Sequence, residues 1–465
     1  MPGAMCLRCL TRSISSLERP ITQLQPLAKA AFSTTANFQK GVKKSASLVK
    51  NGSQTGGGTR LRLKKTKRVV TGRPPQPGER KAIRKRIVLS NTNALEIRGL
   101  HRFQKDNISA SSLEKMRGSF LAFDEATIDA LRALQAFKTS QSWSMFRTAA
   151  TLVRHDTITL ARVIEQQTTD SAGDNPSAAS LVLFGERGSG KSVLQLQAMS
   201  QELTIGTTSY QPTVDSVGKT VYAQPHLTAK LLENILTANE SILSGMRLSK
   251  KHQLPISIPD NISIARLLQL ASRDPSIAWP VWQVLMQELS STPQKGEGLH
   301  RPPVLLTLDS MAHFMKSSEY LNEDVNSIHA QELALVASFT SFLNGQQPMR
   351  NGGLVLAATS GSNRPATPTL DFILAERHAA MKKQAKPTWD PYMERDALVD
   401  RALQGVQAHK IEGLTKDEAK GAMEYYALSG ILRDRITDSF VAEKWTISGG
   451  GVMGELERSC IRQKF

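Results

Sequence analysis

The chain has 465 residues, of which 40% are hydrophobic and 22% charged, values that are ordinary for a globular protein with two or three cores. Its net charge of +18 is unusual. The first ninety residues hold twenty basic and two acidic residues, so the rest of the chain is neutral and the charge belongs to an N-terminal tail. Three cysteines, Cys6, Cys9 and Cys460, are too few for a disulfide framework. The absence of His-Glu-x-x-His and Gly-x-Ser-x-Gly motifs excludes the hydrolases that depend on them.

Residues 1–40 have the composition of a targeting segment. They are rich in Ser, Thr, Arg and Ala, nearly free of acidic residues, and lack a continuous apolar run. This pattern is typical of an amphipathic mitochondrial presequence and not of a secretory signal. The alternative is an N-terminal tail without a targeting role. Since no stretch approaches the ~18 consecutive apolar residues of a membrane span, we expect a protein of the mitochondrial matrix with no membrane span.

Residues 41–115 are predicted to form a basic, disordered extension. Twelve Lys and Arg residues lie between positions 51 and 90, and Pro74, Pro75 and Pro77 prevent a continuous helix across them. Cations at this density repel one another unless a polyanion neutralises them. Binding to nucleic-acid phosphates is favoured because it releases the counterions condensed on them. We therefore expect ribosomal RNA as the partner. A solvated tail without a partner and a tail that binds anionic lipid are the alternatives.

Two helical patterns precede the first strong strand pattern. In "FDEATIDALRALQAF", apolar residues recur every third position at Ile128, Leu131, Leu134 and Phe137, which predicts one helix and the start of the folded body. A second helix is predicted from Trp143 to about residue 166. A loop, "TTDSAGDNPSAAS", then leads into the strand "LVLF". Both helices are expected to pack in the core.

The stretch "LVLFGERGSGKS", residues 181–192, matches a phosphate-binding loop (P-loop). The spacing is Gly185-x4-Gly190-Lys191-Ser192, with Glu186, Arg187, Gly188 and Ser189 between the glycines. Glycines let successive backbone N–H groups point at phosphate oxygens, and the helix expected after the loop adds the positive end of its dipole. Lys191 is predicted to reach the β and γ phosphates, and the Ser192 hydroxyl to bind Mg²⁺.

Two further strand patterns end in polar residues. "PVLLTLDS" ends at Asp309, which is a candidate to hold Mg²⁺ through water. "GGLVLAATS" ends at Thr359 and Ser360, which are candidates to orient a water molecule or a phosphate oxygen. Because parallel strands present their carboxyl ends to a ligand at the same edge of a sheet, these residues and the P-loop predict an α/β P-loop domain.

The motifs of the fast nucleotide hydrolases are missing. Asp309 does not begin the Asp-x-x-Gly pattern of Ras-like GTPases, because Ser310, Met311 and Ala312 follow it. The stretch "TKDE" at 415–418 resembles a guanine-reading motif but precedes a helical run. It is better explained as a capping box with Thr415 and Glu418. A motor ATPase commonly has Glu directly after the magnesium Asp, where this chain has Ser310. Glu323 and Glu332 are other acids whose positions the sequence does not fix, so fast hydrolysis is not expected.

The domain organisation is predicted from the spacing between the motifs and from the positions of prolines. Residues 116–385 are predicted to form the nucleotide-binding domain, with a helical insertion at about 205–300 that is punctuated by several prolines. Trp279 and Trp282 of this insertion are expected to be buried. Residues 386–465 are predicted to form a C-terminal helical lid domain.

The order of these features resembles the death-associated protein three family, the GTP-binding protein of the mitochondrial ribosome small subunit. The matching segments are the presequence, "LFGERGSGKS", "LLTLDS", "QELALVASF", "GGLVLAATS", "DEAKGAMEYYALSG" and "GELERSC", which follow the family order across residues 120–465. The resemblance implies an AAA-like fold with a helical lid, built into the ribosome head. It also implies GTP or GDP with Mg²⁺ at Gly185–Ser192 and Asp309, although the residues themselves do not exclude ATP. Ribosomal RNA and neighbouring small-subunit proteins are the implied partners, so the chain is not expected to act as a free monomer.

One segment departs from the family pattern. Family members have an apolar strand soon after the P-loop helix, whereas this chain has "QELTIGTTSYQPTVDSVGKTVYAQP" there. Either "TVYAQ" forms the strand or this part of the sheet is weak or absent. Two functions remain: a structural ribosomal protein stabilised by a bound nucleotide, or an active NTPase that couples hydrolysis to ribosome assembly or remodelling. A small-molecule kinase is disfavoured, because no lid arginines or acceptor-binding motif stand out.

Overall fold

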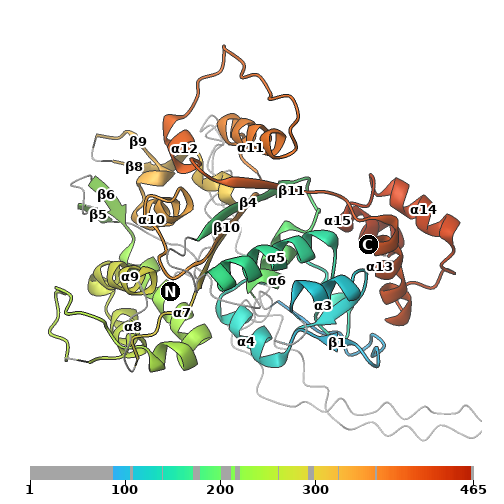
Figure 1. Cartoon of the computed structure of the whole chain (residues 1–465), viewed down its shortest axis with the longest axis horizontal. Helices are drawn as coiled ribbons and strands as arrows, with labels where there is room; N and C mark the ends of the chain where they lie inside the picture. The colour runs from blue at the N-terminus through green and yellow to red at the C-terminus, as the bar shows by residue number, and fades with distance from the viewer. Residues whose placement is uncertain are drawn as a thin grey trace, which may run out of the picture. The chain divides into compact units, whose positions relative to one another are not determined.

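Four parallel strands form the central sheet of the computed structural model (Figure 1). They are β4 (Ala179–Gly185), β7 (Val304–Asp309), β10 (Gly353–Ala358) and β11 (Gln407–Ile411). The strand order is β11-β4-β10-β7, and each neighbouring pair is parallel. The structure describes residues 87–461 except for 105–107, 139, 171–177, 200–210, 215–219, 260, 292–297, 323 and 362–363. The parallel sheet and its flanking helices confirm the α/β prediction.

Both faces of this sheet are covered. In β4, the Leu181 and Leu183 side chains join an apolar cluster with residues of α5 (His155–Asp170) and α6 (Lys191–Met199). Val182 joins a different cluster, formed with the helices of residues 225–290. The same alternation separates Leu354 from Val355 in β10. Because successive side chains of a strand point to opposite faces, near-continuous apolar strands require such double coverage.

The region before the P-loop combines short strands and helices. In chain order its elements are β1 (His101–Arg102), α3 (Ala110–Lys115), β2 (Phe120–Ala122), α4 (Glu125–Ala133), η3 (Trp143–Met145), β3 (Ala150–Leu152) and α5 (His155–Asp170). Strand β2 pairs parallel with β1 and antiparallel with β3. Leu89 and Phe103 are already buried in a core cluster, so the folded body begins before residue 123, where the sequence predicted it.

Both predicted helices of this region differ from the structure. The first, α4, ends at Ala133, and a positive φ of 56° at Gln135 turns the chain, so Phe137 is buried from outside the helix. The second prediction, residues 143–166, was wrong in its first half: a 3₁₀ turn and strand β3 precede α5. The pairing of β3 with β2 explains the difference, because a strand partner overrides local helical spacing.

Three helices fill the predicted insertion: α7 (Pro225–Gly245), α8 (Ile264–Arg273) and α9 (Pro275–Ser290). Helix α6 (Lys191–Met199) comes before them. Ser263 caps α8 by accepting the Arg266 N–H, and Asp274 caps α9. Trp279 and Trp282 are buried, as predicted, within the apolar cluster that joins these helices to the sheet.

The segment "TVYAQ" does form a strand, but it does not extend the central sheet. Strand β6 (Thr220–Ala223) pairs antiparallel with β5 (Gln211–Val214), and its link beyond this hairpin is a parallel bridge between Tyr222 and Leu333. Among the described residues, β7 is therefore an edge strand of the four-stranded sheet.

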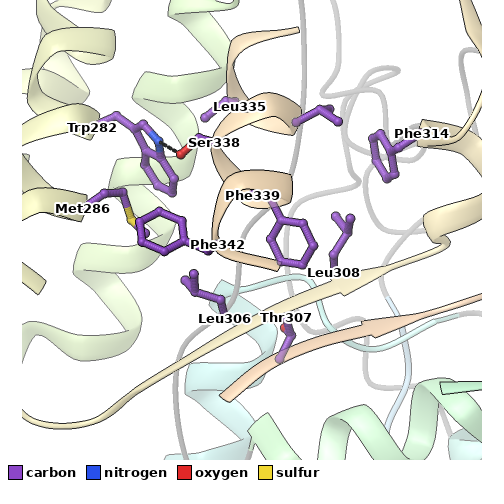
Figure 2. A pocket seen from close by; sticks show the side chains of 11 residues that line it. Trp282, Met286, Leu306, Thr307, Leu308, Phe314, Leu335, Ser338, Phe339 and Phe342 are labelled. Atoms are coloured by element: carbon purple, nitrogen blue, oxygen red, sulfur yellow. Dashed lines mark hydrogen bonds between the residues drawn. The ribbon is translucent and has the colours of Figure 1, made fainter. Parts of the chain in front are cut away.

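Helix α10 (Ala334–Leu343) packs beside β7 and α9, as Figure 2 shows from close by. It follows η4 (Met311–Phe314), β8 (Ser317–Leu321), β9 (Ser327–His329) and η5 (Ala330–Glu332). A cavity of about 30 Å³ lies between β7, α9, α10 and η4, lined mainly by apolar side chains that include Trp282, Leu306, Phe339 and Phe342. Trp282 Nε1 donates to Ser338 Oγ at 3.2 Å on its wall. The volume is close to that of one water molecule, so the cavity is a packing gap in the core.

The C-terminal part contains α11 (Pro368–Met381), α12 (Ala397–Ala402), α13 (Lys416–Leu428), α14 (Asp438–Ile447) and α15 (Met453–Cys460). Thr415 and Glu418 form the predicted capping box at the start of α13, with reciprocal side-chain to backbone hydrogen bonds. Tyr425 and Tyr426 of α13 pack against Phe120 and Phe146 from the N-terminal region. The two ends of the described chain thus share one apolar cluster.

Residues 1–86 lie outside the described residues. They include the predicted presequence and all twelve cations of the basic run. The predicted disorder does not reach residue 115, because Leu89 and Phe103 are buried in the core and α3 ends at Lys115. The predicted helical lid, residues 386–465, also contributes β11 to the central sheet, because β11 pairs with β4. The boundaries at 40 and 385 stay predictions. None of the helices in the described part of the chain is both long and apolar enough to cross a membrane.

Candidate nucleotide-binding site

The P-loop lies at the carboxyl edge of the sheet, between the end of β4 at Gly185 and the start of α6 at Lys191. Gly185 has a φ of 146° and passes so close to β11 that a Cβ there would lie 2.7 Å from the Ile411 carbonyl oxygen. Gly190 has a φ of 97°, which L side chains rarely adopt. The first amides of α6 have no partner earlier in the helix, so they offer donors to an anion at this end.

Lys191 is buried, and its ammonium group lies against the loop itself. Nζ donates to the Gly185 carbonyl at 3.0 Å, to the Glu186 carbonyl at 2.6 Å and to Ser189 Oγ at 3.3 Å. Burial lowers the pKa of Lys191 to about 8, and the charges of Arg364 and Lys138 act in the same direction, against the effect of Asp309. A bound polyanion would favour the charged ammonium, so the site is electrostatically prepared for phosphate.

Ser192 and Asp309, the two predicted magnesium ligands, are brought together by a third residue. Lys138 Nζ donates to Ser192 Oγ at 3.1 Å and forms an ion pair with the Asp309 carboxylate. Both side chains of this ion pair are about three-quarters buried. One cation therefore contacts both of the oxygens that the sequence assigned to Mg²⁺.

The residues around Asp309 do not supply an obvious base. Ser310 follows directly, with a φ of 65°, and its N–H donates to Asp309 Oδ1 at 2.6 Å. Glu332, one of the two other acids considered from the sequence, accepts the His329 N–H at 3.1 Å in a capping box. Glu323 lies outside the described residues.

Thr359 and Ser360 follow β10 and are buried next to the P-loop strand, where the Thr359 N–H donates to the Leu183 carbonyl at 2.9 Å. The next residue, Gly361, packs on the P-loop: a Cβ there would lie 2.6 Å from Arg187 Cα. The structure thus brings Thr359, Ser360 and Asp309 to the same edge as the P-loop. Their roles toward a ligand stay predictions.

Arg154, at the start of α5, supports the loop from behind. Its guanidinium donates to the Ser189 carbonyl at 2.6 Å and to the Glu412 carbonyl at 2.5 Å, and it pairs with Asp156 at 2.6 Å. Burial acts to raise the pKa of Asp156, but the hydrogen bond with His409 and the Arg154 charge outweigh it, so this pKa is below its ordinary value. Arg154 therefore ties the P-loop to α5 and to the segment after β11.

The C-terminal helix also contacts the loop directly. The Gly454 N–H, in the first turn of α15, donates to the Gly188 carbonyl at 2.9 Å. A Cβ on Gly454 would lie 3.2 Å from Gly188 Cα, which leaves little room for a side chain. The position of α15 is thus coupled to the shape of the P-loop.

Sequence reasoning missed Lys138, Arg154 and Arg364. Each lies in a stretch without a motif, and Lys138 is 171 positions from the Asp309 that it contacts. Arg364 pairs with Asp371 and lies near enough for its charge to affect Lys191. No sequence pattern around these three residues marks them as part of a site, so they can be found only from the fold.

The residues present fit a nucleotide with Mg²⁺. The loop supplies amide donors and a buried lysine for phosphate, and Ser192 and Asp309 supply the hard oxygen ligands that Mg²⁺ prefers. Lys138 pairs with Asp309 and Arg364 pairs with Asp371, whereas the Lys191 ammonium donates to two carbonyls and a hydroxyl and is the group best placed to meet a phosphate.

A comparison with known protein families shows where this chain belongs. Residues 151–459 match the family described as "Mitochondrial ribosomal death-associated protein 3". The chain belongs to this family. The matched range includes β4, the P-loop, β7, β10 and the C-terminal helices, and it begins at β3.

Two relatives align with this chain over most of their length. The chain is 38% identical over 484 residues to the small ribosomal subunit protein mS29 of Neurospora crassa, with 99% of each protein covered. It is 24% identical over 355 residues to the protein of the same name of Schizosaccharomyces pombe, covering 72% of this chain and 70% of the relative. Among solved structures, a Walker-type ATPase of Pyrococcus abyssi matches with a TM-score of 0.32 and 11% identity over 63% of each chain.

Proposed function

We propose that this protein is a component of the small subunit of the mitochondrial ribosome that holds a purine nucleotide with Mg²⁺ at its P-loop. The printed names of both curated relatives support the ribosomal assignment. The observation that carries the nucleotide assignment is the buried Lys191 ammonium between the carbonyls of Gly185 and Glu186, beside the Ser192 and Asp309 oxygens. The base proposed from the family resemblance is guanine, as GTP or GDP.

The proposed role of the nucleotide is structural. Ser310 stands where a motor ATPase has a catalytic Glu, and the Glu332 carboxylate is engaged in a helix cap. A ligand that binds only the folded state stabilises it in proportion to the logarithm of its concentration over its dissociation constant. The P-loop contacts α5 through Arg154 and α15 through Gly454, so this stabilisation would extend to α5 and to the C-terminal helix.

Partners are proposed from the tail and the relatives. In the mitochondrial matrix, the twelve basic residues between positions 51 and 90 would neutralise phosphates of ribosomal RNA. Neighbouring small-subunit proteins would cover part of the remaining surface, so the protein would act within the particle.

The test replaces Lys191 with Ala in the full chain, which is expressed in the organism that it comes from so that it can reach the mitochondrial ribosome. Nucleotide occupancy of the purified small subunit and the amount of variant protein incorporated into it are measured together, with mass spectrometry identifying the base. We expect occupancy to fall by about two orders of magnitude at limiting nucleotide, from the loss of several charge-assisted hydrogen bonds, and incorporation to fall with it. Normal incorporation and normal thermal stability with an empty site would contradict the structural role, and extracted ATP would contradict the guanine assignment.

A further inference from the structure

Lys138 lies in the site although no sequence motif marks it. It lies in the turn after α4, and its Nζ contacts Ser192 Oγ at 3.1 Å and the Asp309 carboxylate. In P-loop proteins these two kinds of oxygen, a hydroxyl at the start of the P-loop helix and a carboxylate at the end of a neighbouring strand, hold the magnesium ion. The ammonium group of Lys138 thus contacts the two oxygens that would hold the metal.

The backbone around Lys138 is held in place by its neighbours. The Lys138 N–H donates to Gln141 Oε1 at 2.8 Å, and the same oxygen accepts from Trp143 Nε1 at 2.7 Å. On either side, Phe137 and Trp143 are buried and pack edge to face with ring centroids 5.6 Å apart. This apolar anchor fixes where the side chain of Lys138 starts, so its contact with Asp309 is directed by the fold.

An ammonium group and a magnesium ion cannot bind both oxygens together. The ammonium has three donors, which lets it serve the hydroxyl and the carboxylate at once, and its charge offsets that of Asp309. Mg²⁺ binds oxygens at about 2.1 Å in an octahedral shell, which would fill the space that the ammonium takes. Occupancy by one cation therefore opposes occupancy by the other.

We propose that Lys138 is an internal counter-cation of the nucleotide site, which holds Ser192 and Asp309 together without a metal and competes with Mg²⁺ for their oxygens. This inference rests on the proposed nucleotide binding. Mg²⁺ that arrives with a nucleotide must displace the Lys138 ammonium from these oxygens, so Mg²⁺ adds little to the nucleotide affinity of the natural protein. Without the Lys138 charge, Mg²⁺ becomes the cation that the phosphates and Asp309 require, so the affinity becomes strongly dependent on it.

The experiment measures the dissociation constant of GDP by calorimetry on the full chain, once in MgCl₂ and once in EDTA. The proteins are the natural chain, Lys138→Met, Lys138→Gln and, as a matched control, Lys230→Met, which removes an exposed lysine of α7. For the natural chain and the control, we expect the two media to give values within about threefold. For both Lys138 variants, removal of Mg²⁺ should weaken binding by about tenfold or more, the effect of losing a charge-assisted contact.

The outcomes separate the two proposals. If the natural chain binds no GDP in either medium, the guanine-nucleotide function fails, and the counter-cation role falls with it. If GDP binds and the natural chain already needs Mg²⁺ as strongly as the Lys138 variants do, the nucleotide function stands and the counter-cation role alone is overturned. Lys138→Gln keeps a polar side chain at this position, so agreement between the two variants assigns the effect to charge and not to misfolding.

Discussion

The nucleotide edge of the sheet and the helical region α7–α9 hold their charges in different ways. In the helical region, Glu288 and Arg301 are each 1% exposed and pair at 2.6 Å, and each has further partners, so the buried charges balance. At the nucleotide edge, Lys138 pairs with Asp309 and Arg364 with Asp371, whereas the buried Lys191 ammonium donates to the Gly185 and Glu186 carbonyls and to Ser189 Oγ. Loss of one partner from a buried ion pair is costly for folding, whereas an ammonium group that donates to neutral oxygens is available to an anionic ligand. The two regions should therefore respond differently to substitution.

The largest effect is expected from Arg301→Met in the helical region. Arg301 donates to Glu288 Oε2 and to the carbonyls of Arg247 and Gly298, so its loss leaves the Glu288 carboxylate buried with fewer partners. We expect the free energy of unfolding to fall by about 3–5 kcal/mol in a denaturant titration. Nucleotide affinity per folded molecule should stay unchanged. That result would show that this region contributes to folding and not to nucleotide binding.

A matched double variant sharpens that prediction. Glu288→Gln combined with Arg301→Met removes the uncompensated charge, so it should recover part of the lost stability. If the double variant were less stable than Arg301→Met by the full effect of Glu288→Gln alone, the two side chains would not be coupled as the structure indicates.

A smaller effect is expected from pH at the nucleotide edge. The pKa of Lys191 is lowered to about 8, so the free protein loses this charge as the pH rises through about 8, whereas bound phosphate would raise the pKa and keep the proton. Binding would then take up a proton, and affinity for GDP should fall about tenfold between pH 7 and pH 9. Calorimetry in buffers of different ionisation enthalpy would detect the proton uptake.

Lys191→Arg is the control for this pH dependence. A guanidinium stays charged over the whole interval, so its GDP affinity should vary less with pH than that of the natural chain, whatever its absolute value. Ionisation of the nucleotide is common to both proteins and cancels in the ratio. Equal pH profiles for the two proteins would show that Lys191 does not titrate in this range.

The smallest effect is expected in the core beside the cavity of Figure 2. Thr307 is 2% exposed, and its Oγ1 is a buried atom without a hydrogen-bond partner in the described part of the chain. Thr307→Val keeps the shape and removes the unpaired hydroxyl, so stability should rise by about 1 kcal/mol. Ser338→Ala is the opposite case, because it takes the acceptor from Trp282 Nε1, and it should lower stability by a similar amount. Thermal unfolding of both variants tests this pair.

The parts of the site that lie within a few residues of one another could be predicted from the sequence. The P-loop and the capping box of Thr415 and Glu418 are local patterns, and Asp309 could be placed because an apolar strand precedes it. Lys138 could not, because a turn after α4 brings it to Ser192 and Asp309 through tertiary packing alone.

The errors in the fold have the same origin. Residues 150–152 have helical spacing around them, but pairing with β2 makes them a strand. The segment after the P-loop helix has too few apolar residues to be buried on both faces of a sheet, and β6 pairs with β5 in a separate hairpin. In both places, partners that are distant in sequence decided the local structure.

The structural role proposed for the nucleotide requires that the P-loop retain it without steady hydrolysis. The direct measurement isolates native small subunits, washes them extensively, and follows both the nucleotide retained per subunit and phosphate release from added GTP. We predict about one retained guanine nucleotide per subunit and no release beyond a single turnover. Steady phosphate release that disappears in Lys191→Ala subunits would contradict the account and identify the protein as an active NTPase.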